Sequence, residues 1–168
     1  MLFRMTYINY FKESVSIAPY APTSFDTIRY MLTLAELKPG ETLYDLGCGD
    51  GRIVIIAAQE FKANAIGIEL REDLVKKALE EIRKNNLEKR AKIIQGDLFS
   101  IDISDADVVT LYLTTSANEK VRPKLEKELK NGARVVSHDF EIPKWKPIKI
   151  EKFNFDTIYL YKKGISYI

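Results

Sequence analysis

The residues best suited to chemistry lie between Tyr44 and Ile53, in the stretch YDLGCGDGRI, where glycine occupies every second position from Gly47 to Gly51. Gly47, Gly49 and Gly51 are three of only 8 glycines in 168 residues. A glycine turn between a strand and a helix lets the backbone approach a ligand with no Cβ in the way, and the helix N-terminus behind it offers free N–H groups. The stretch therefore predicts a nucleotide-like cofactor, although a tight turn alone would also use these glycines.

The spacing of the glycines and the acidic residues around them narrow the choice of cofactor. The pattern is G-x-G-x-G, not the G-x-G-x-x-G of dinucleotide-binding proteins, and Asp45 ahead of it would repel a pyrophosphate. Glu69 and Asp97 end the next two predicted strands. A carboxylate there can accept both hydroxyls of a ribose, and another can accept from an adenine amine. Singly, either acid is explained as a solvated strand end. Together they predict a nucleoside that carries an amino acid, S-adenosylmethionine.

Strands and helices must alternate to bring these residues together. We predict strands over residues 42–46, 65–69, 91–96, 107–113 and 133–138, and helices over 23–37, 52–61, 71–86 and 116–132. Ser116 and Glu119 form a capping-box pattern at the start of the last helix. Runs 148–153 and 155–161, with Asn154 between them, predict a closing hairpin. The predicted fold is a single-domain α/β, Rossmann-like sheet, mainly parallel with a C-terminal antiparallel hairpin.

The bulk composition describes a soluble globular chain. It is 46% hydrophobic and 30% charged, with a net charge of +2 that neither requires nor excludes nucleic acid. Cys48 is the only cysteine, so no internal disulfide forms, and without a Cys/His cluster we expect no metal. No apolar run approaches the ~20 residues of a membrane span. We expect a cytoplasmic protein, and its Lys, Glu and Ile bias is also seen in thermophile proteins.

Residues 45–51 (DLGCGDG), Glu69 and Asp97 resemble the successive motifs of class I S-adenosylmethionine-dependent methyltransferases over residues 40–162. The segments 19–23 (PYAPT), 111–114 (LYLT) and 137–141 (SHDFE), with Trp145, are similar to those of small archaeal protein lysine methyltransferases, and of a related mitochondrial group in eukaryotes. Ala21 and Asp139 depart mildly from that pattern. The resemblance implies a methyltransferase domain over 17–168. It leaves 1–16 as an extension that we expect to be disordered.

The resemblance also implies roles for individual residues. The expected cofactor-binding residues are Tyr20, Thr23, Asp45, Gly47, Gly49, Asp50, Gly51, Glu69, Leu70, Asp97 and Leu98. Tyr112, Tyr20 and Phe140 are expected to position the acceptor, and Thr114, Glu141 and Trp145 to bind the substrate. Core packing would explain each aromatic ring equally well, and Thr23 could instead be a helix N-cap. We identify no dedicated general base; His138 is structural, part of a proton relay or a substrate contact.

Several features of the sequence favour a lysine acceptor on a protein. The segment after the fourth strand, LTTS (113–116), lacks the Pro-Pro turn that holds planar amines, and no cysteine is free to attack a pyrimidine. No insertion is long enough to close over a small substrate. The resemblance implies broad specificity, and we expect a monomer whose partners are proteins with exposed lysines, including chromatin-like basic proteins and the enzyme itself.

Two other functions remain open from the sequence. One is an RNA or small-molecule methyltransferase on the same fold, which the basic segment 120–130 would serve if it were not interrupted by Glu126 and Glu128. The other is a non-catalytic S-adenosylmethionine-binding protein. Nucleic acid and membrane partners are not indicated. An NAD-binding domain is disfavoured by the glycine spacing.

Overall fold

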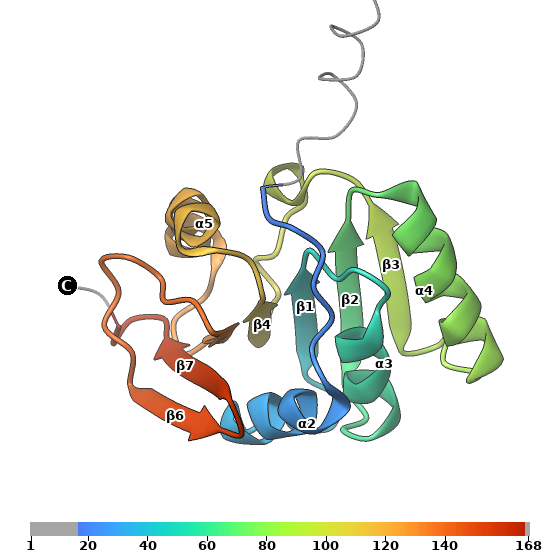
Figure 1. Ribbon diagram of the computed structural model, residues 1–168, viewed down its shortest axis with the longest axis horizontal. Helices are drawn as coiled ribbons and strands as arrows, with labels where there is room; N and C mark the ends of the chain where they lie inside the picture. The colour runs from blue at the N-terminus through green and yellow to red at the C-terminus, as the bar shows by residue number, and fades with distance from the viewer. Residues whose placement is uncertain (1–16, 167–168) are drawn as a thin grey trace, which may run out of the picture.

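A computed structural model describes residues 17–166 as one mixed sheet flanked by helices (Figure 1). The predicted extension, residues 1–16, lies outside the described residues. The strands are β1 (Thr42–Leu46), β2 (Asn64–Glu69), β3 (Ala91–Gln95), β4 (Val108–Leu111), β5 (Arg134–His138), β6 (Lys149–Phe153) and β7 (Asp156–Lys162). The helices are α2 (Phe25–Leu34), α3 (Arg52–Gln59), α4 (Glu72–Lys84), the short 3₁₀ helix η1 (Leu98–Ser100) and α5 (Thr115–Glu128).

The sheet topology confirms the predicted fold class. The strand order is β3-β2-β1-β4-β5-β7-β6 in a 7-stranded sheet. Strands β1 to β5 pair in parallel, whereas β7 runs antiparallel to both β5 and β6. Chain connections leave β1 and β4 towards opposite edges of the sheet, so these neighbouring strands form the topological switch point where open α/β sheets bind ligands.

Two hydrophobic clusters lie on the two faces of the sheet. Leu43 packs in one cluster with residues of α2 and α3, while its neighbour Tyr44 packs in the other with residues of α5. This alternation follows from the period of two in a strand, which sends successive side chains to opposite faces. Both faces are therefore covered, and the residues left for ligand binding are at the strand ends.

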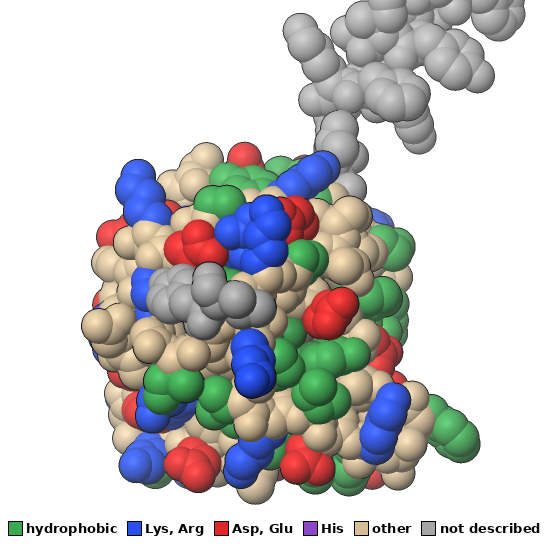
Figure 2. All heavy atoms as spheres, turned by 90° about the vertical axis from the view of Figure 1, so that its left-hand side faces the viewer, with side chains coloured by type: hydrophobic (Ala, Val, Ile, Leu, Met, Phe, Trp, Pro, Cys, Tyr) green, Lys and Arg blue, Asp and Glu red, His purple; other side chains and the backbone are tan. Residues whose placement is uncertain are grey.

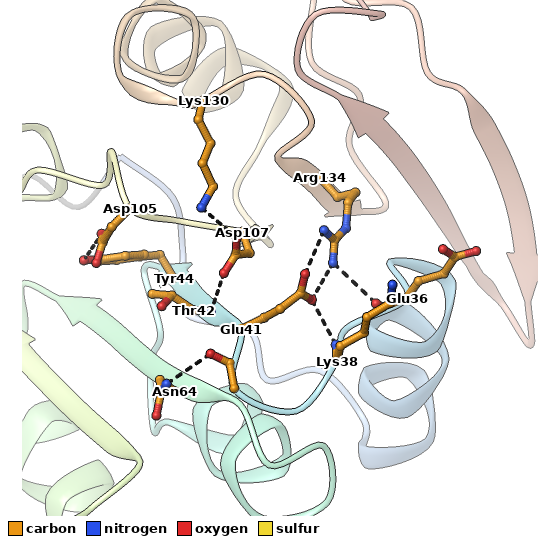
Figure 3. A network of polar contacts seen from close by, with 11 residues as sticks. Glu36, Lys38, Glu41, Thr42, Tyr44, Asn64, Asp105, Asp107, Lys130 and Arg134 are labelled. Atoms are coloured by element: carbon orange, nitrogen blue, oxygen red, sulfur yellow. Dashed lines mark hydrogen bonds and ion pairs between the residues drawn. The ribbon is translucent and has the colours of Figure 1, made fainter.

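Polar contacts tie together the amino ends of the central strands (Figure 3). Arg134, at the start of β5, donates to the Glu41 carboxylate at 2.6 Å and to the Ala35 carbonyl at 2.9 Å. Asp107, just before β4, accepts from the Thr42 backbone N–H at 2.8 Å and pairs with Lys130 at 2.7 Å. These contacts hold the amino ends of the strands together, on the side of the sheet opposite to the carboxyl ends.

Two predicted helix starts are wrong by one or two residues. The capping box at Ser116 does not form: Thr114 is the N-cap of α5, and its hydroxyl accepts from the Ala117 N–H at 3.1 Å. The helix ends at Glu128, short of the predicted glycine end. Likewise Ser24, not Thr23, caps α2 by accepting from Thr27. The Thr23 side chain is consequently available for a different contact, described below.

Gly51, at the start of α3, lies in a tightly packed part of the glycine loop. Gly51 has φ +82°, and a Cβ there would lie 2.8 Å from the Ala78 Cβ in α4, whereas Gly132 has φ +88° with nothing within 4 Å of its Cβ position. Gly132→Ala should cost only the left-handed conformation, about 1–2 kcal/mol. Gly51→Ala should cost about 1–3 kcal/mol more, because α4 must shift. Urea unfolding of both variants measures the difference, and equal losses would contradict it.

Candidate functional site

A cleft of about 250 Å³ opens at the carboxyl ends of the central strands. It lies between the glycine loop after β1, the ends of β2 to β4, and residues 17–23, which we call the strap. Figure 1 shows the strap running past the end of β1 towards α2. The cleft is lined by most of the residues predicted to bind the cofactor, and by two of the three predicted to position the acceptor, Tyr20 and Tyr112. The predicted residues that line it are Tyr20, Thr23, Asp45, Gly47, Gly49, Asp50, Glu69, Leu70, Asp97, Leu98 and Tyr112.

The strap is held over the glycine loop by packing and by ionic contacts. Tyr20 lies so close to Gly49 that a Cβ there would be 2.8 Å from the ring, so the Tyr20 side chain would have to move to admit a larger residue. Arg52, the first residue of α3, donates to the Thr23 carbonyl at 3.0 Å and makes two bonds to Asp50, at 2.9 and 3.1 Å. Although burial opposes it, hydrogen bonding to Arg52 lowers the pKa of Asp50. One arginine therefore connects the strap to the loop.

Asp45 is a buried acid in the floor of the cleft. Its side chain is 3% exposed and accepts from the Thr110 hydroxyl at 2.8 Å. Burial raises the pKa of Asp45 to about 7; the Thr110 bond opposes this, and the nearby Glu69 and Asp50 add to it. A cation in the cleft would favour the ionised form. This acid therefore fits a ligand with a positive charge, as a sulfonium or an α-ammonium group has.

Glu69 is fixed by backbone donors and faces the glycine loop. One carboxylate oxygen accepts from the Gly49 N–H at 2.9 Å, and the other accepts from Leu70 and Arg71 at 2.9 and 3.0 Å. Carboxylate oxygens have further lone pairs, so ribose hydroxyls can still donate to them. Asp97, exposed at the end of β3, caps η1 by accepting from Phe99. The donor and acceptor set of the cleft thus fits S-adenosylmethionine.

Tyr112 connects this cleft with a second group of residues at the end of β5. Its ring centroid is 3.9 Å from that of His138 and 6.4 Å from that of Phe140. The Nδ1 atom of His138 lies 3.1 Å from the Thr23 hydroxyl, which joins the strap to β5. The structure therefore brings Phe140 next to Tyr112, although Phe140 does not itself line the cleft.

The structure does not bring the other predicted residues to the cleft. Gly51 packs on α4, Thr114 caps α5, and Glu141 is exposed beyond the lining residues. Trp145 is 5% exposed and donates to the Glu126 carboxylate at 3.0 Å. It is therefore a core residue, which is one of the two roles that the sequence left open for it.

The sequence analysis assigned no role to three residues of this region. Arg52 holds the strap, while Asp139 and Asp156 lie 3.4 and 3.2 Å from His138 Nε2. Asp156 follows the hairpin turn at Asn154, and the pairing of His138 with Ile158 brings it to the end of β5. The sequence predicted the hairpin of β6 with β7, but not the pairing of β7 with β5.

Comparison with known proteins decides the family. The family described as the ANTKMT methyltransferase domain matches residues 45–149. A protein-lysine N-methyltransferase of Saccharolobus islandicus is 49% identical over 151 residues, which cover 87% of this chain and 94% of that protein. The chain belongs to this methyltransferase family. The mouse adenine nucleotide translocase lysine N-methyltransferase is 33% identical over 143 residues, which cover 85% of this chain and 62% of that protein.

A solved structure supports both the fold and the cofactor of this methyltransferase. The crystal structure of an RNA methyltransferase from Salinibacter ruber in complex with S-adenosyl-L-homocysteine has a TM-score of 0.85 and 43% sequence identity. The similarity covers 88% of this chain and 97% of that one. The protein is an S-adenosylmethionine-dependent methyltransferase, and the cleft at the glycine loop is where its residues fit the cofactor.

Replacing Asp45 should separate stability from cofactor binding. The raised pKa, about 7 in the folded protein, means that the acid's contribution to stability is present below its unfolded pKa of ~3.9 and is lost as the pH rises through 7. Asp45→Asn, which keeps an oxygen for Thr110, should therefore raise the melting temperature of the cofactor-free protein at pH 8. It should weaken S-adenosylmethionine binding and abolish its strengthening from pH 6 to 8. Calorimetry tests both, and an unchanged pH dependence of binding would contradict the assignment.

Arg52 and Arg29 form a matched pair for testing the strap. Arg29 makes a similar two-bond contact with Glu60, at 2.8 and 2.9 Å, on the exposed surface. Arg52→Lys should increase the Kd for S-adenosylmethionine about tenfold, because a charged hydrogen bond contributes ~1.5–3 kcal/mol and lysine lacks the two-pronged geometry. Arg29→Lys should leave binding unchanged. Stopped-flow association and dissociation rates together give the Kd, and equal effects of the two variants would exclude a role for the strap.

Proposed function

We propose that this methyltransferase transfers the methyl group of S-adenosylmethionine to lysine side chains of proteins, with broad specificity. The observation that carries the proposal is the 49% identity to the Saccharolobus islandicus protein-lysine N-methyltransferase over 94% of that protein. The mouse relative is also a lysine methyltransferase by name, and so is a 30% identical human protein named for an ATP synthase subunit.

The residues of the cleft, together with the neighbouring Phe140, have distinct tasks in this reaction. We assign the ribose hydroxyls to Glu69, the adenine amine to Asp97 and the amino-acid part to the glycine loop with Thr23. The bound cofactor supplies an electrophilic methyl group on a sulfonium. Tyr112, Tyr20 and Phe140 then hold the aliphatic stem of the acceptor lysine and any methylated ammonium against their rings. Positioning provides most of the acceleration in such a displacement.

The open shape of the acceptor side favours a macromolecular substrate. Only η1 and a loop follow β3, and a loop without a helix connects β5 to β6. A side chain projecting from a protein surface can enter without a lid. We propose basic, chromatin-like proteins and the enzyme itself among the substrates. We also propose that it acts as a monomer in the cytoplasm of a thermophilic archaeon. Within residues 17–166, no helix has the length and apolarity that crossing a bilayer requires.

RNA is the second candidate acceptor, because the Salinibacter ruber structure is of an RNA methyltransferase. The charge distribution of α5 argues against it. Arg122 pairs with Glu119 and Glu126 at 2.9 and 3.0 Å, and Lys124 pairs with Glu128 at 2.8 Å, so these cations are neutralised within the helix. On the face drawn in Figure 2, Lys and Arg side chains are interspersed with acidic and apolar ones.

The deciding experiment incubates the purified protein and labelled S-adenosylmethionine in two separate reactions, one with a lysine-rich basic protein and one with RNA. Peptide mass spectrometry should find gains of one methyl unit on lysines of the substrate or of the enzyme. Label in RNA alone would establish the second candidate. Binding of the cofactor without transfer to either would indicate a small-molecule enzyme or a non-catalytic binding protein.

A further inference from the structure

The single histidine of the sequence is buried at the end of β5, and one of its two ring nitrogens makes no well-formed hydrogen bond within the described residues. His138 is 3% exposed, and its Nδ1 contacts the Thr23 hydroxyl at 3.1 Å. Its Nε2 makes no well-formed hydrogen bond to any residue of the described chain, yet it lies 3.2 Å from Asp156 Oδ1 and 3.4 Å from Asp139 Oδ2. A buried polar atom in this state requires an explanation, and a nitrogen aimed at two carboxylates is suited to receive a proton.

Both carboxylates are oriented by other contacts. Asp156 accepts from the Thr27 hydroxyl at 2.7 Å through Oδ2, and Asp139 accepts from the Thr157 N–H at 2.9 Å through Oδ1. In each case the other oxygen faces the imidazole. Their side chains are 27% and 32% exposed, so a cation arriving from solvent can reach them, whereas the imidazole is shielded.

The backbone at Asp139 is strained. Its φ is +63°, and the Phe140 N–H donates to the His138 carbonyl at 2.8 Å, which closes a three-residue turn around it. The γ-turn with positive φ at its centre is rare and strained. Such conformations persist where the surrounding structure enforces them, and they cluster at functional sites. Here the turn points Asp139 at the imidazole and places Phe140 beside Tyr112.

This cluster adjoins the cofactor cleft through Tyr112. The Tyr112 ring packs against the imidazole, with the centroids 3.9 Å apart and the planes tilted by 35°, and Tyr112 also lines the cleft. Burial first, and then the charges of Asp139 and Asp156, raise the pKa of Tyr112. The polar groups facing His138 are thus the Thr23 hydroxyl from the strap, Tyr112 from the end of β4, and the two carboxylates from the ends of β5 and β7.

On the basis of lysine as the acceptor, we propose that His138, Asp139 and Asp156 form the proton-accepting centre of the reaction. A lysine ammonium has a reference pKa of ~10.4 and must lose a proton before it can attack. The two carboxylates receive the ammonium; an N–H bond breaks, and its proton passes through a carboxylate oxygen to Nε2, giving an imidazolium between two anions. The freed lone pair forms the N–C bond, and the C–S electron pair remains on sulfur. The imidazolium then returns its proton to water through the exposed carboxylates.

The first test uses the cofactor-free protein and needs no turnover. Because His138 is the only histidine, its imidazole Cε1–H signal is unambiguous in a proton NMR spectrum. A peptide with one lysine should shift this signal towards its imidazolium position, and the same peptide with norleucine should not. The lysine-specific shift should vanish in Asp156→Asn and persist in Asp26→Asn, a matched change at an α2 carboxylate that is 78% exposed. Equal shifts with both peptides would overturn the proposal.

The second test is the pH dependence of single-turnover methylation by His138→Gln. General-base catalysis contributes ~10²–10⁴-fold, so the variant should be slower by about that factor at pH 7. The deficit should shrink as the pH approaches ~10, where free lysine loses its proton unaided. A deficit that is the same at all pH values would mean a structural role and overturn the proposal. If His138→Gln does not fold, Asp156→Asn takes its place. Absence of methyl-lysine in the wild-type reaction would instead overturn the proposed function.

Discussion

The parallel pairing of β1 with both β2 and β4 is the constraint on which the rest of the site depends. In this register Asp45 lies between Gly67 and Thr110. Thr110 supplies the hydroxyl that the buried acid needs, and Gly67 leaves room for Cys48, whose sulfur lies 2.5 Å from the position a Cβ of Gly67 would occupy. The glycine loop can fold back over β2 only because this space is empty, and its backbone then reaches Glu69.

Several acidic residues line the cleft, and their negative charge is compensated in three ways. Glu69 accepts hydrogen bonds from the Gly49 N–H of the loop and from the Leu70 and Arg71 N–H groups that follow β2, and Asp50 forms an ion pair with the Arg52 guanidinium. Asp45 has only one neutral hydroxyl, and its pKa rises to about 7 as burial dictates. The negative charge of the cleft is therefore not fully compensated until a cation enters. A sulfonium cofactor meets that need, whereas a pyrophosphate would be repelled.

The strap connects the cofactor side with the acceptor side. Through its carbonyl, Thr23 is held by Arg52 at the glycine loop, and through its hydroxyl it contacts His138 at the end of β5. Four residues further on, Thr27 binds Asp156. Thr23 and Thr27 thus join the glycine loop to the groups that we propose receive the acceptor.

The sequence by itself determined the order of strands and helices, the glycine loop, and the acids at three successive strand ends. These features are local: each depends on the periodicity or the turn chemistry of a short segment, and parallel strands automatically bring their carboxyl ends to one edge. Only the tertiary structure decided that Trp145 packs in the core, that Arg52 holds the strap, and that Asp156 meets His138. Those contacts join segments far apart in the chain, and the contact of Asp156 with His138 depends on the antiparallel register of β7 against β5, which no local pattern specifies.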